Sequence, residues 1–246
     1  MKNIIKLHSI GSTNSYLAGI AGDLPHASIV STYNQTAGRG QRGNTWESEP
    51  GKNLSFSVLL RPHNIIAAQQ FYISEAVSIA IVNTLRQYIT NHKVAIKWPN
   101  DIYVDDNKIC GILIENTLSG INITQSIAGI GININQREFL SDAPNPISLI
   151  HYTGTETPLD TILEEVSDEI ISLFNYYDST RRFDDLHSIY CSMTWRRKGF
   201  HPYITPNGYQ FMARILYIEP NGILTLADTN NTPHSFAFKE VQAVIK

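Results

Sequence analysis

The feature that most constrains the fold of this chain is a change of hydrophobic periodicity at Gly199. Before that residue both periodicities occur, because apolar residues recur at helical spacing over residues 69–89 and Leu54–Leu60 alternates as a strand does. Beyond it the apolar residues only alternate, between short turn sequences, and no stretch fits a helix. The pattern predicts a mixed α+β domain over residues 1–199 and a small all-β domain over residues 200–246.

The larger domain is predicted to be a mixed, largely antiparallel sheet with flanking helices. Two helices besides residues 69–89 are expected, one with Thr157 as N-cap and Pro158 at its first position, and one over Phe183–Trp195. The basic run Arg196–Gly199 is typical of a helix C-terminus. Strands are expected at Asn3–His8, Ser28–Tyr33, Leu54–Leu60, Val94–Trp98, Ile102–Val104, Ile109–Ile114 and Ile121–Ile134 and, in the smaller domain, at Gln210–Tyr217, Ile223–Ala227 and His234–Phe238.

Composition excludes several classes of protein. The chain has 246 residues and a formal charge of −3, whereas a whole-molecule nucleic-acid binder is usually basic, so we expect no DNA partner. The N-terminus lacks the apolar core of a signal peptide, and no run approaches the roughly 18 apolar residues of a membrane span. Two isolated cysteines, Cys110 and Cys191, form no disulfide framework. We therefore expect a cytoplasmic protein with no membrane partner.

A glycine-rich loop follows the second predicted strand, and Gly38–Gly43 matches the pattern G-x-G-x-x-G. The dinucleotide-binding form of this pattern opens a helix, and none is expected here. Val94–Lys97 spells the V-A-I-K of protein kinases, but the H-R-D and D-F-G motifs do not follow. Glycines and arginines together also suit an anion clamp, since backbone N–H groups can approach a ligand closely. On its own, the loop fits an anion clamp and a plain surface loop equally well.

Three further segments carry polar residues or glycines at the ends or within predicted strands. Lys97–Asp101 ends a strand with Pro99, which leaves two polar side chains at a turn. Lys108 begins a largely apolar strand, and residues 129–135 alternate glycine with isoleucine before ending in asparagine. Each segment also has a purely structural interpretation: an Asx turn, a solvated lysine and close packing of one sheet face.

Taken in order along the chain, these segments resemble the catalytic core of biotin protein ligases. The resemblance covers about residues 5–135, and Phe238–Val241 agrees with the small C-terminal domain of that family. It implies a fold like that of class II aminoacyl-tRNA synthetases and biotin ligases, followed by an SH3-like β-barrel. The segments that carry the resemblance are Ser12–Asn14, Gln35–Gly40, Lys97–Asp101, Lys108–Glu115 and Gly129–Asn133.

The resemblance implies an ATP-dependent ligase. Biotin would be activated as biotinyl-5′-AMP and then transferred to one lysine of the biotin carboxyl carrier domain of a biotin-dependent carboxylase. The substrates would be biotin and ATP, with Mg²⁺ bound by ligands that the sequence does not identify, in a monomer or a homodimer. Because activation brings a carboxylate against a triphosphate, such a site needs fixed cations and N–H donors.

The resemblance also assigns roles to individual residues. Arg39 and Lys108 would be catalytic, with Arg39 clamping the carboxylate and Lys108 stabilising charge as it develops. The biotin-binding residues would be Ser12, Thr13, Asn14, Gln35, Gly38, Arg39, Gly40, Gln41, Lys108, Gly111, Gly129 and Gly131. The ATP-binding residues would be Arg39, Arg42, Trp46, Asn100, Asp101, Lys108 and Asn133.

Two departures from the family and two alternatives bear on this hypothesis. Gln41 stands where the family often has an arginine that helps to retain the adenylate, and the residues before Ser12 are too few for a helix-turn-helix domain. We therefore expect no repressor function. A lipoate–protein ligase of the same fold and a non-catalytic binding module are the alternatives, and the Lys97–Asp101 and Lys108–Gly111 segments favour biotin.

Overall fold

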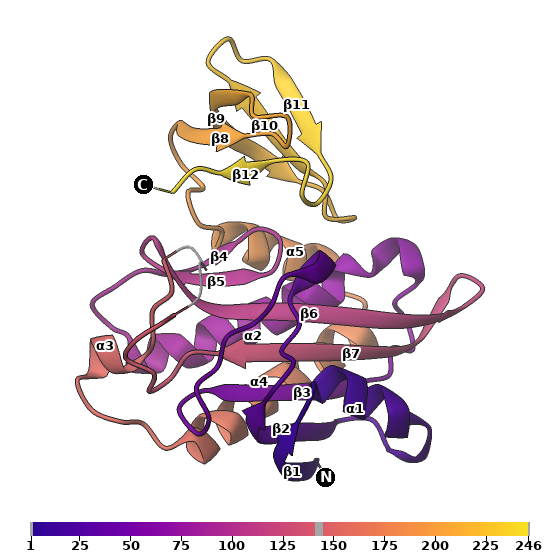
Figure 1. The fold of residues 1–246 in the computed structure, drawn as a ribbon. Coiled ribbons are helices and arrows are strands. Elements are labelled where there is room, and N and C mark those ends of the chain that lie inside the picture. The colour runs from indigo at the N-terminus through magenta and orange to yellow at the C-terminus, as the bar shows by residue number, and fades with distance from the viewer. Residues whose placement is uncertain (1, 141–144, 246) are drawn as a thin grey trace.

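The computed structural model describes residues 2–140 and 145–245, apart from the side chain of Arg42. Within these residues, seven strands form one sheet in the order β1-β2-β3-β7-β6-β5-β4 (Figure 1). Strands β1 and β2 run parallel, and the other neighbouring pairs run antiparallel. The predicted mixed, largely antiparallel sheet is confirmed. The strands are β1 Asn3–Ile10, β2 Ser28–Gln35, β3 Leu54–Leu60, β4 Val94–Lys97, β5 Asp101–Val104, β6 Asn107–Ser119 and β7 Asn122–Ile132.

Helices cover both faces of this sheet. On one face the long helices α2, α4 and α5 bury the main core, where alternate sheet residues such as Val58 and Ile130 point. On the other face α1 packs through Leu17 onto Val30 and Leu59 and covers only part of the sheet. The rest of that face is left for a site. The helices are α1 Thr13–Ile20, α2 Phe71–Tyr88, α3 Ile150–Thr153, α4 Leu159–Thr180 and α5 Phe183–Ser192, with 3₁₀ turns at Ala21–Asp23, Gln41–Gly43 and Ala67–Gln69.

Two predicted helix ends were wrong. Helix α5 ends at Ser192 and not at Trp195, because the chain turns there to pair with β4: Ile96 N–H donates to Met193 O and Trp195 N–H to Ile96 O. Arg196–Gly199 is therefore no helix terminus. Helix α4 begins at Leu159 with Pro158 and not Thr157 at the N-cap, because the backbone of Pro158 is still extended, with φ −60° and ψ 123°. The Thr157 backbone instead exchanges two hydrogen bonds with the Asn135 side chain.

The residues beyond Gly199 form a second sheet, whose order is β11-β10-β9-β8-β12, with all neighbouring pairs antiparallel. Two of its strands were not predicted, since β8 is short and contains Pro202 and β12 has only two residues. Figure 1 shows this C-terminal unit above helix α5 and strands β4 and β5. The strands are β8 His201–Ile204, β9 Gln210–Ile218, β10 Leu224–Asp228, β11 Pro233–Phe236 and β12 Gln242–Ala243.

Side chains of the larger unit hold the C-terminal unit by its backbone. Trp98 Nε1–H donates to Gly222 O at 2.9 Å, and Arg196 Nη1–H donates to Val244 O at 2.9 Å. His187 Nε2 lies 2.8 Å from Ile218 O. The predicted basic run thus supplies a contact between the two units. In the part of the chain that the structure describes, no helix has the length and apolarity needed to cross a membrane.

Candidate active site

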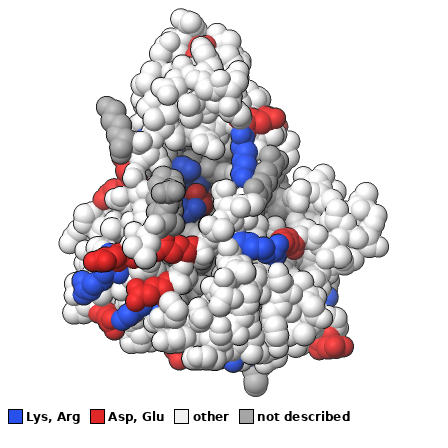
Figure 2. Space-filling model, in the orientation of Figure 1, with Lys and Arg blue, Asp and Glu red and all other residues white. Residues whose placement is uncertain are grey.

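A cavity of about 910 Å³ opens between the larger unit and the C-terminal unit. Figure 2 shows charged side chains of both signs inside this hollow. Its floor is the sheet face that α1 leaves uncovered, and its far side is lined by residues of the C-terminal unit such as Tyr203 and Val241. The cavity brings together almost all the residues that the sequence assigned to the site.

The floor of the cavity is made by glycines on strands β6 and β7. Along β7, Ile130 and Ile132 point into the core, so that Gly129 and Gly131 face the opposite side. A Cβ on Gly131 would lie 2.4 Å from the Trp46 ring, and one on Gly111 would lie 2.9 Å from it. The alternation of glycine and isoleucine therefore gives a packed core on one face and a close-approach floor on the other.

One end of the floor is polar. Thr13 N–H and Oγ1 lie 2.9 and 3.2 Å from Gln35 Oε1. Ser57 Oγ lies 2.7 Å from Thr13 Oγ1 and 2.6 Å from Asn14 Oδ1. The Asn14 side chain passes over β7 at Gly129, and a Cβ added to Gly129 would lie 2.2 Å from Asn14 Oδ1. Helix α1 begins here, because Ser12 caps it by accepting from Ser15 N–H.

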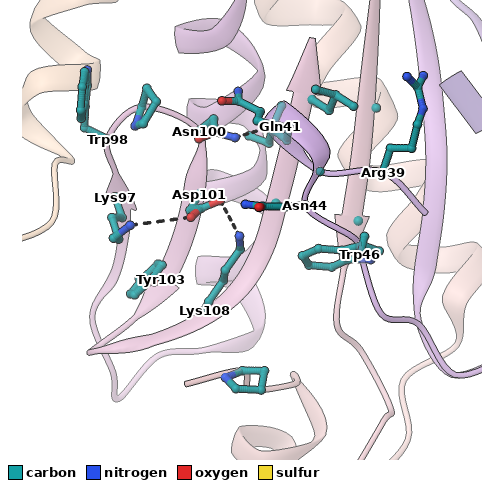
Figure 3. Close-up of a pocket in the computed structure, with 18 of the residues that line it drawn as sticks. Arg39, Gln41, Asn44, Trp46, Lys97, Trp98, Asn100, Asp101, Tyr103 and Lys108 are labelled. Carbon is teal, nitrogen blue, oxygen red and sulfur yellow. Dashed lines mark hydrogen bonds and ion pairs between the residues drawn. The ribbon is translucent and has the colours of Figure 1, made fainter. Parts of the chain in front are cut away.

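The other end of the cavity carries two lysines and one aspartate. Lys108 Nζ lies 2.7 Å from Asp101 Oδ1, and Lys97 Nζ lies 3.8 Å from Asp101 Oδ2 (Figure 3). Lys108 Nζ also lies 5.6 Å from the centre of the Trp46 ring. Burial lowers the pKa of the Lys97 ammonium, and the positive charges of Lys108 and Arg196 lower it further against the pull of Asp101. The three side chains carry a net positive charge into the cavity.

Two asparagines flank this cluster. Asn100 is fixed to β6 by two hydrogen bonds with Ile112. Its side-chain Nδ2–H donates to Ile112 O at 2.7 Å, and its main-chain oxygen accepts from Ile112 N–H at 3.0 Å. Asn133 donates to Ile147 O at 3.1 Å through Nδ2, while its buried Oδ1 has no partner. No group of three or more His, Cys, Asp or Glu side chains that could hold a metal ion occurs among the described residues.

The glycine-rich loop lies along the rim. Gly40 N–H donates to Asn44 O at 2.7 Å, and Trp46 N–H donates to Gly38 O at 3.0 Å, which closes the loop on itself. Arg39 and Gln41 line the cavity, but the guanidinium of Arg39 is bound by Glu115, with Nη2 at 3.2 and 3.0 Å from its two oxygens. Figure 3 shows the Arg39 side chain directed away from the lysine cluster. The side chain of Arg42 lies outside the described part of the structure.

Sequence reasoning missed several residues that shape the site. Lys97 belongs to the Lys97–Asp101 segment but was assigned no role, although a lysine directly before the Trp98-Pro99 turn was a usable signal. Glu115 ends the Lys108–Glu115 segment and likewise had no predicted role. Ser57 and Lys239 had no local signal, because they reach the site from a central strand and from the C-terminal unit, respectively.

Residues 8–133, about half of the chain, match the model of the biotin/lipoate A/B protein ligase family. The chain belongs to this family. The matched stretch contains the glycine-rich loop, the lysine cluster and the glycine floor, so the whole constellation described above, apart from its C-terminal wall, lies in the part that biotin/lipoate ligases share.

Curated members of the biotin/lipoate ligase family match about half of the chain. The bifunctional ligase/repressor BirA of Salmonella typhimurium is 37% identical over 143 residues, which are 58% of this chain and 44% of that protein. A biotin–[acetyl-CoA-carboxylase] ligase of Paracoccus denitrificans is 34% identical over 126 residues, 50% of this chain and 51% of the relative. The chain thus spans about half the length of these relatives.

Solved structures of family members match along the whole chain. The biotin protein ligase of Aquifex aeolicus in complex with biotin and ATP gives a TM-score of 0.82 at 21% identity and covers 100% of both chains. That of Leishmania major with biotinyl-5-AMP gives 0.65 at 20% identity and covers 96% of this chain and 98% of the other. The chain therefore has the α+β biotin ligase fold, including its small C-terminal β unit.

Proposed function

We propose that this protein is an ATP-dependent biotin–protein ligase. The observation that carries the proposal is a single cavity with a polar end at Thr13, Asn14 and Gln35 and a cationic end at Lys97 and Lys108, joined by a glycine floor. Biotin has a polar ureido ring at one end and a carboxylate at the other. The cavity thus offers hydrogen-bonding groups to the ring and positive charge to the carboxylate and the triphosphate.

The proposed reaction has two steps. The biotin carboxylate attacks the α-phosphorus of ATP, a P–O bond to pyrophosphate breaks, and biotinyl-5′-AMP forms. A lysine amine of the carrier domain then attacks the biotinyl carbonyl, the C–O bond to AMP breaks, and the amine proton leaves with the formation of the amide. Both steps concentrate negative charge where Lys108 lies, so Lys108 is proposed to stabilise it throughout.

The remaining site residues take roles in the same proposal. The main chain of Gly38, Arg39 and Gly40 would cover the bound biotin, and the Arg39 guanidinium could clamp a carboxylate only after leaving Glu115. Trp46, Asn100 and Asn133 would contact the nucleotide, with Gln41 and Arg42 at the mouth. Asp101 is proposed to face Mg²⁺ that is bound mainly by the phosphates, in keeping with the few protein ligands this ion usually takes.

The proposed acceptor is the biotin carboxyl carrier domain of a carboxylase, and the proposed compartment is the cytoplasm. Two free thiols, Cys110 and Cys191, suit a reducing compartment. We further propose that residues 1–199 form the catalytic domain and residues 200–246 a separate β domain, in a monomer or homodimer.

The test is to mix the protein with biotin, ATP, Mg²⁺ and an apo carrier domain and to weigh the carrier by mass spectrometry. A gain of one biotin that requires ATP is expected. Parallel reactions contain lipoate, because the family includes lipoate ligases. If lipoate reacts in place of biotin, the protein is a lipoate ligase. If neither reacts while biotin still binds, it is a binding module.

A further inference from the structure

Glu115 lies on strand β6 and contacts two residues that line the cavity, Arg39 and Asn14. Its two carboxylate oxygens accept from Arg39 Nη2 of the glycine-rich loop at 3.2 and 3.0 Å. Its Oε2 also accepts from Asn14 Nδ2 of helix α1 at 2.7 Å. The side chains of Arg39 and Glu115 are 46% and 42% exposed, so an isolated pair of this kind would contribute little.

Asn14 makes this pair different from an isolated surface ion pair. Asn14 is buried, donates also to Leu113 O at 3.2 Å and lies against Gly129 and Ser57. Its position is therefore fixed by the sheet, and its hydrogen bond fixes the Glu115 carboxylate in turn. Arg39 then binds a carboxylate that is already ordered, so less side-chain entropy is lost when the pair forms.

The glycine-rich loop, residues 38–46, is anchored at its end by the Trp46 ring, which lies on the glycine floor, so its middle depends on other contacts. Its backbone hydrogen bonds close the loop on itself, between Gly40 and Asn44 and between Gly38 and Trp46. Among the described side chains, two polar contacts link this middle part to its surroundings from opposite sides: Arg39 to Glu115 on the sheet, and Lys239 Nζ to Gln41 O at 3.0 Å from the C-terminal unit. Of these two, only the Arg39–Glu115 contact also reaches the polar end of the floor.

We propose that Glu115 is a positioning residue. By binding Arg39 of the glycine-rich loop and Asn14 at the polar end of the cavity, it keeps the loop in a fixed position relative to that end. Its part in substrate binding rests on the proposed function, since the loop main chain is what would cover bound biotin. Glu115 itself touches no reacting atom. Its loss is expected to affect biotin binding, and therefore KM, more than kcat.

The experiment compares Glu115→Gln with Glu156→Gln, which removes the charge from an exposed ion pair with Lys52 outside the cavity. Glutamine at 115 keeps an oxygen for Asn14 but loses the charge that binds Arg39. Three quantities are measured: the rate of tryptic cleavage within residues 38–46, the Kd and KM for biotin, and Tm. We expect Glu115→Gln to raise the cleavage rate and the Kd about five-fold, with Tm and kcat nearly unchanged. Glu156→Gln should match the wild type.

A double-mutant cycle separates positioning from general weakening. The cycle follows cleavage after Arg42 alone, because Arg39→Ala removes the other tryptic site of the loop. If Glu115 acts through Arg39, Glu115→Gln should add nothing to the cleavage after Arg42 of an Arg39→Ala variant. Additive effects, unchanged cleavage and Kd, or a fall in Tm that accounts for both would overturn the proposal. Should the wild type bind no biotin at all, the proposed function fails, but the cleavage rates still decide whether Glu115 fixes the loop.

Discussion

At the scale of single residues, the cavity is organised by an imbalance of charge. Asp101 contacts both Lys97 and Lys108, so one negative charge is shared by two positive ones. A charge surplus in a partly enclosed cavity attracts anions more strongly than the same surplus in water, because the local dielectric constant is lower. The acidic net charge of −3 for the whole chain thus says little about the charge that a ligand meets here.

Replacing Lys108 by alanine is expected to slow adenylate formation about 100-fold or more, since one preorganised charge donor to the reacting oxygens is lost. The rate is measured as pyrophosphate release in the presence of biotin. Lys198→Ala, at an exposed position, is the control and should be unaffected. Unchanged turnover in Lys108→Ala, with an unchanged Tm, would remove Lys108 from the mechanism.

Gln41 offers a second prediction at this scale. Its side-chain Oε1 is buried without a partner at the mouth of the cavity. Gln41→Arg places a cation there and is expected to slow the release of the adenylate, by about ten-fold if the new charge gains 1.4 kcal/mol from the phosphate. Release is measured by mixing enzyme that holds labelled adenylate with excess unlabelled biotin and following the loss of bound label with time. Gln210→Arg, at an exposed position of β9, is the control, and equal release rates in the two variants would refute the idea.

At the scale of elements, segments with a clear period could be predicted, including strands as short as β4 and β5, whereas segments without one could not. The apolar stripe over residues 69–89 predicted a helix, and α2 lies within it at Phe71–Tyr88. The alternation over Leu54–Leu60 predicted a strand, and β3 has these bounds. Helix α1 was missed because its eight residues contain Gly19 and no long stripe. What stabilises α1 is tertiary, namely Leu17 packing between strands and Asn14 reaching across β7.

The same contrast holds for the site. The sequence suggested two interpretations of the glycines that alternate with isoleucines, a ligand contact and close packing of one sheet face. In the structure the isoleucines pack into the core and the glycines line the cavity. The contact of Lys239 with Gln41, by contrast, joins residues far apart in the chain, and no local pattern encodes it. Partners of this kind depend on how two units pack, which the periodicity of either unit does not specify.

Gly131→Ala tests the floor. The new Cβ would lie 2.4 Å from the Trp46 ring, so the ring must move away from β7. Affinity for biotin and ATP is expected to fall about ten-fold or more, while Tm changes little because the displaced ring lies on a surface loop. Binding is measured by calorimetry. Gly22→Ala, where a Cβ meets nothing within 4 Å, is the matched control. Normal binding by Gly131→Ala would show that the ring does not shape the ligand site.

At the scale of the whole molecule, a buried acid–base pair links the two units. Glu75 of α2 is fully buried, and its Oε1 lies 2.6 Å from His187 Nδ1, while His187 Nε2 contacts Ile218 O of β9. Burial raises the pKa of Glu75 to about 7. Hydrogen bonds to Cys191 and to Glu75 raise the pKa of His187 to about 10. Both shifts mean that the folded state holds protons more tightly than the unfolded chain does.

Stability should therefore fall as the pH rises. The His187 contribution is fully present below its ordinary pKa of about 6.5 and is lost as the pH approaches 10, and the raised pKa of Glu75 acts in the same direction between about 4.5 and 7. We expect Tm of the wild type to decline from pH 6 to 10 and that of His187→Gln to start lower but decline less. His234→Gln, at an exposed histidine of the C-terminal unit, should follow the wild type. Parallel curves for wild type and His187→Gln would contradict this account.

The way the C-terminal unit is attached has a consequence for how such chains can diverge. Trp98, His187 and Arg196 all contact main-chain oxygens, which every amino acid supplies. Apart from Gly222, where the Phe71 ring leaves little room for a side chain, these contacts place no demand on residue identity. These main-chain contacts can thus survive sequence drift, in agreement with a structural match over the whole chain at 21% identity. A C-terminal unit grafted from a distant relative should dock in the same place.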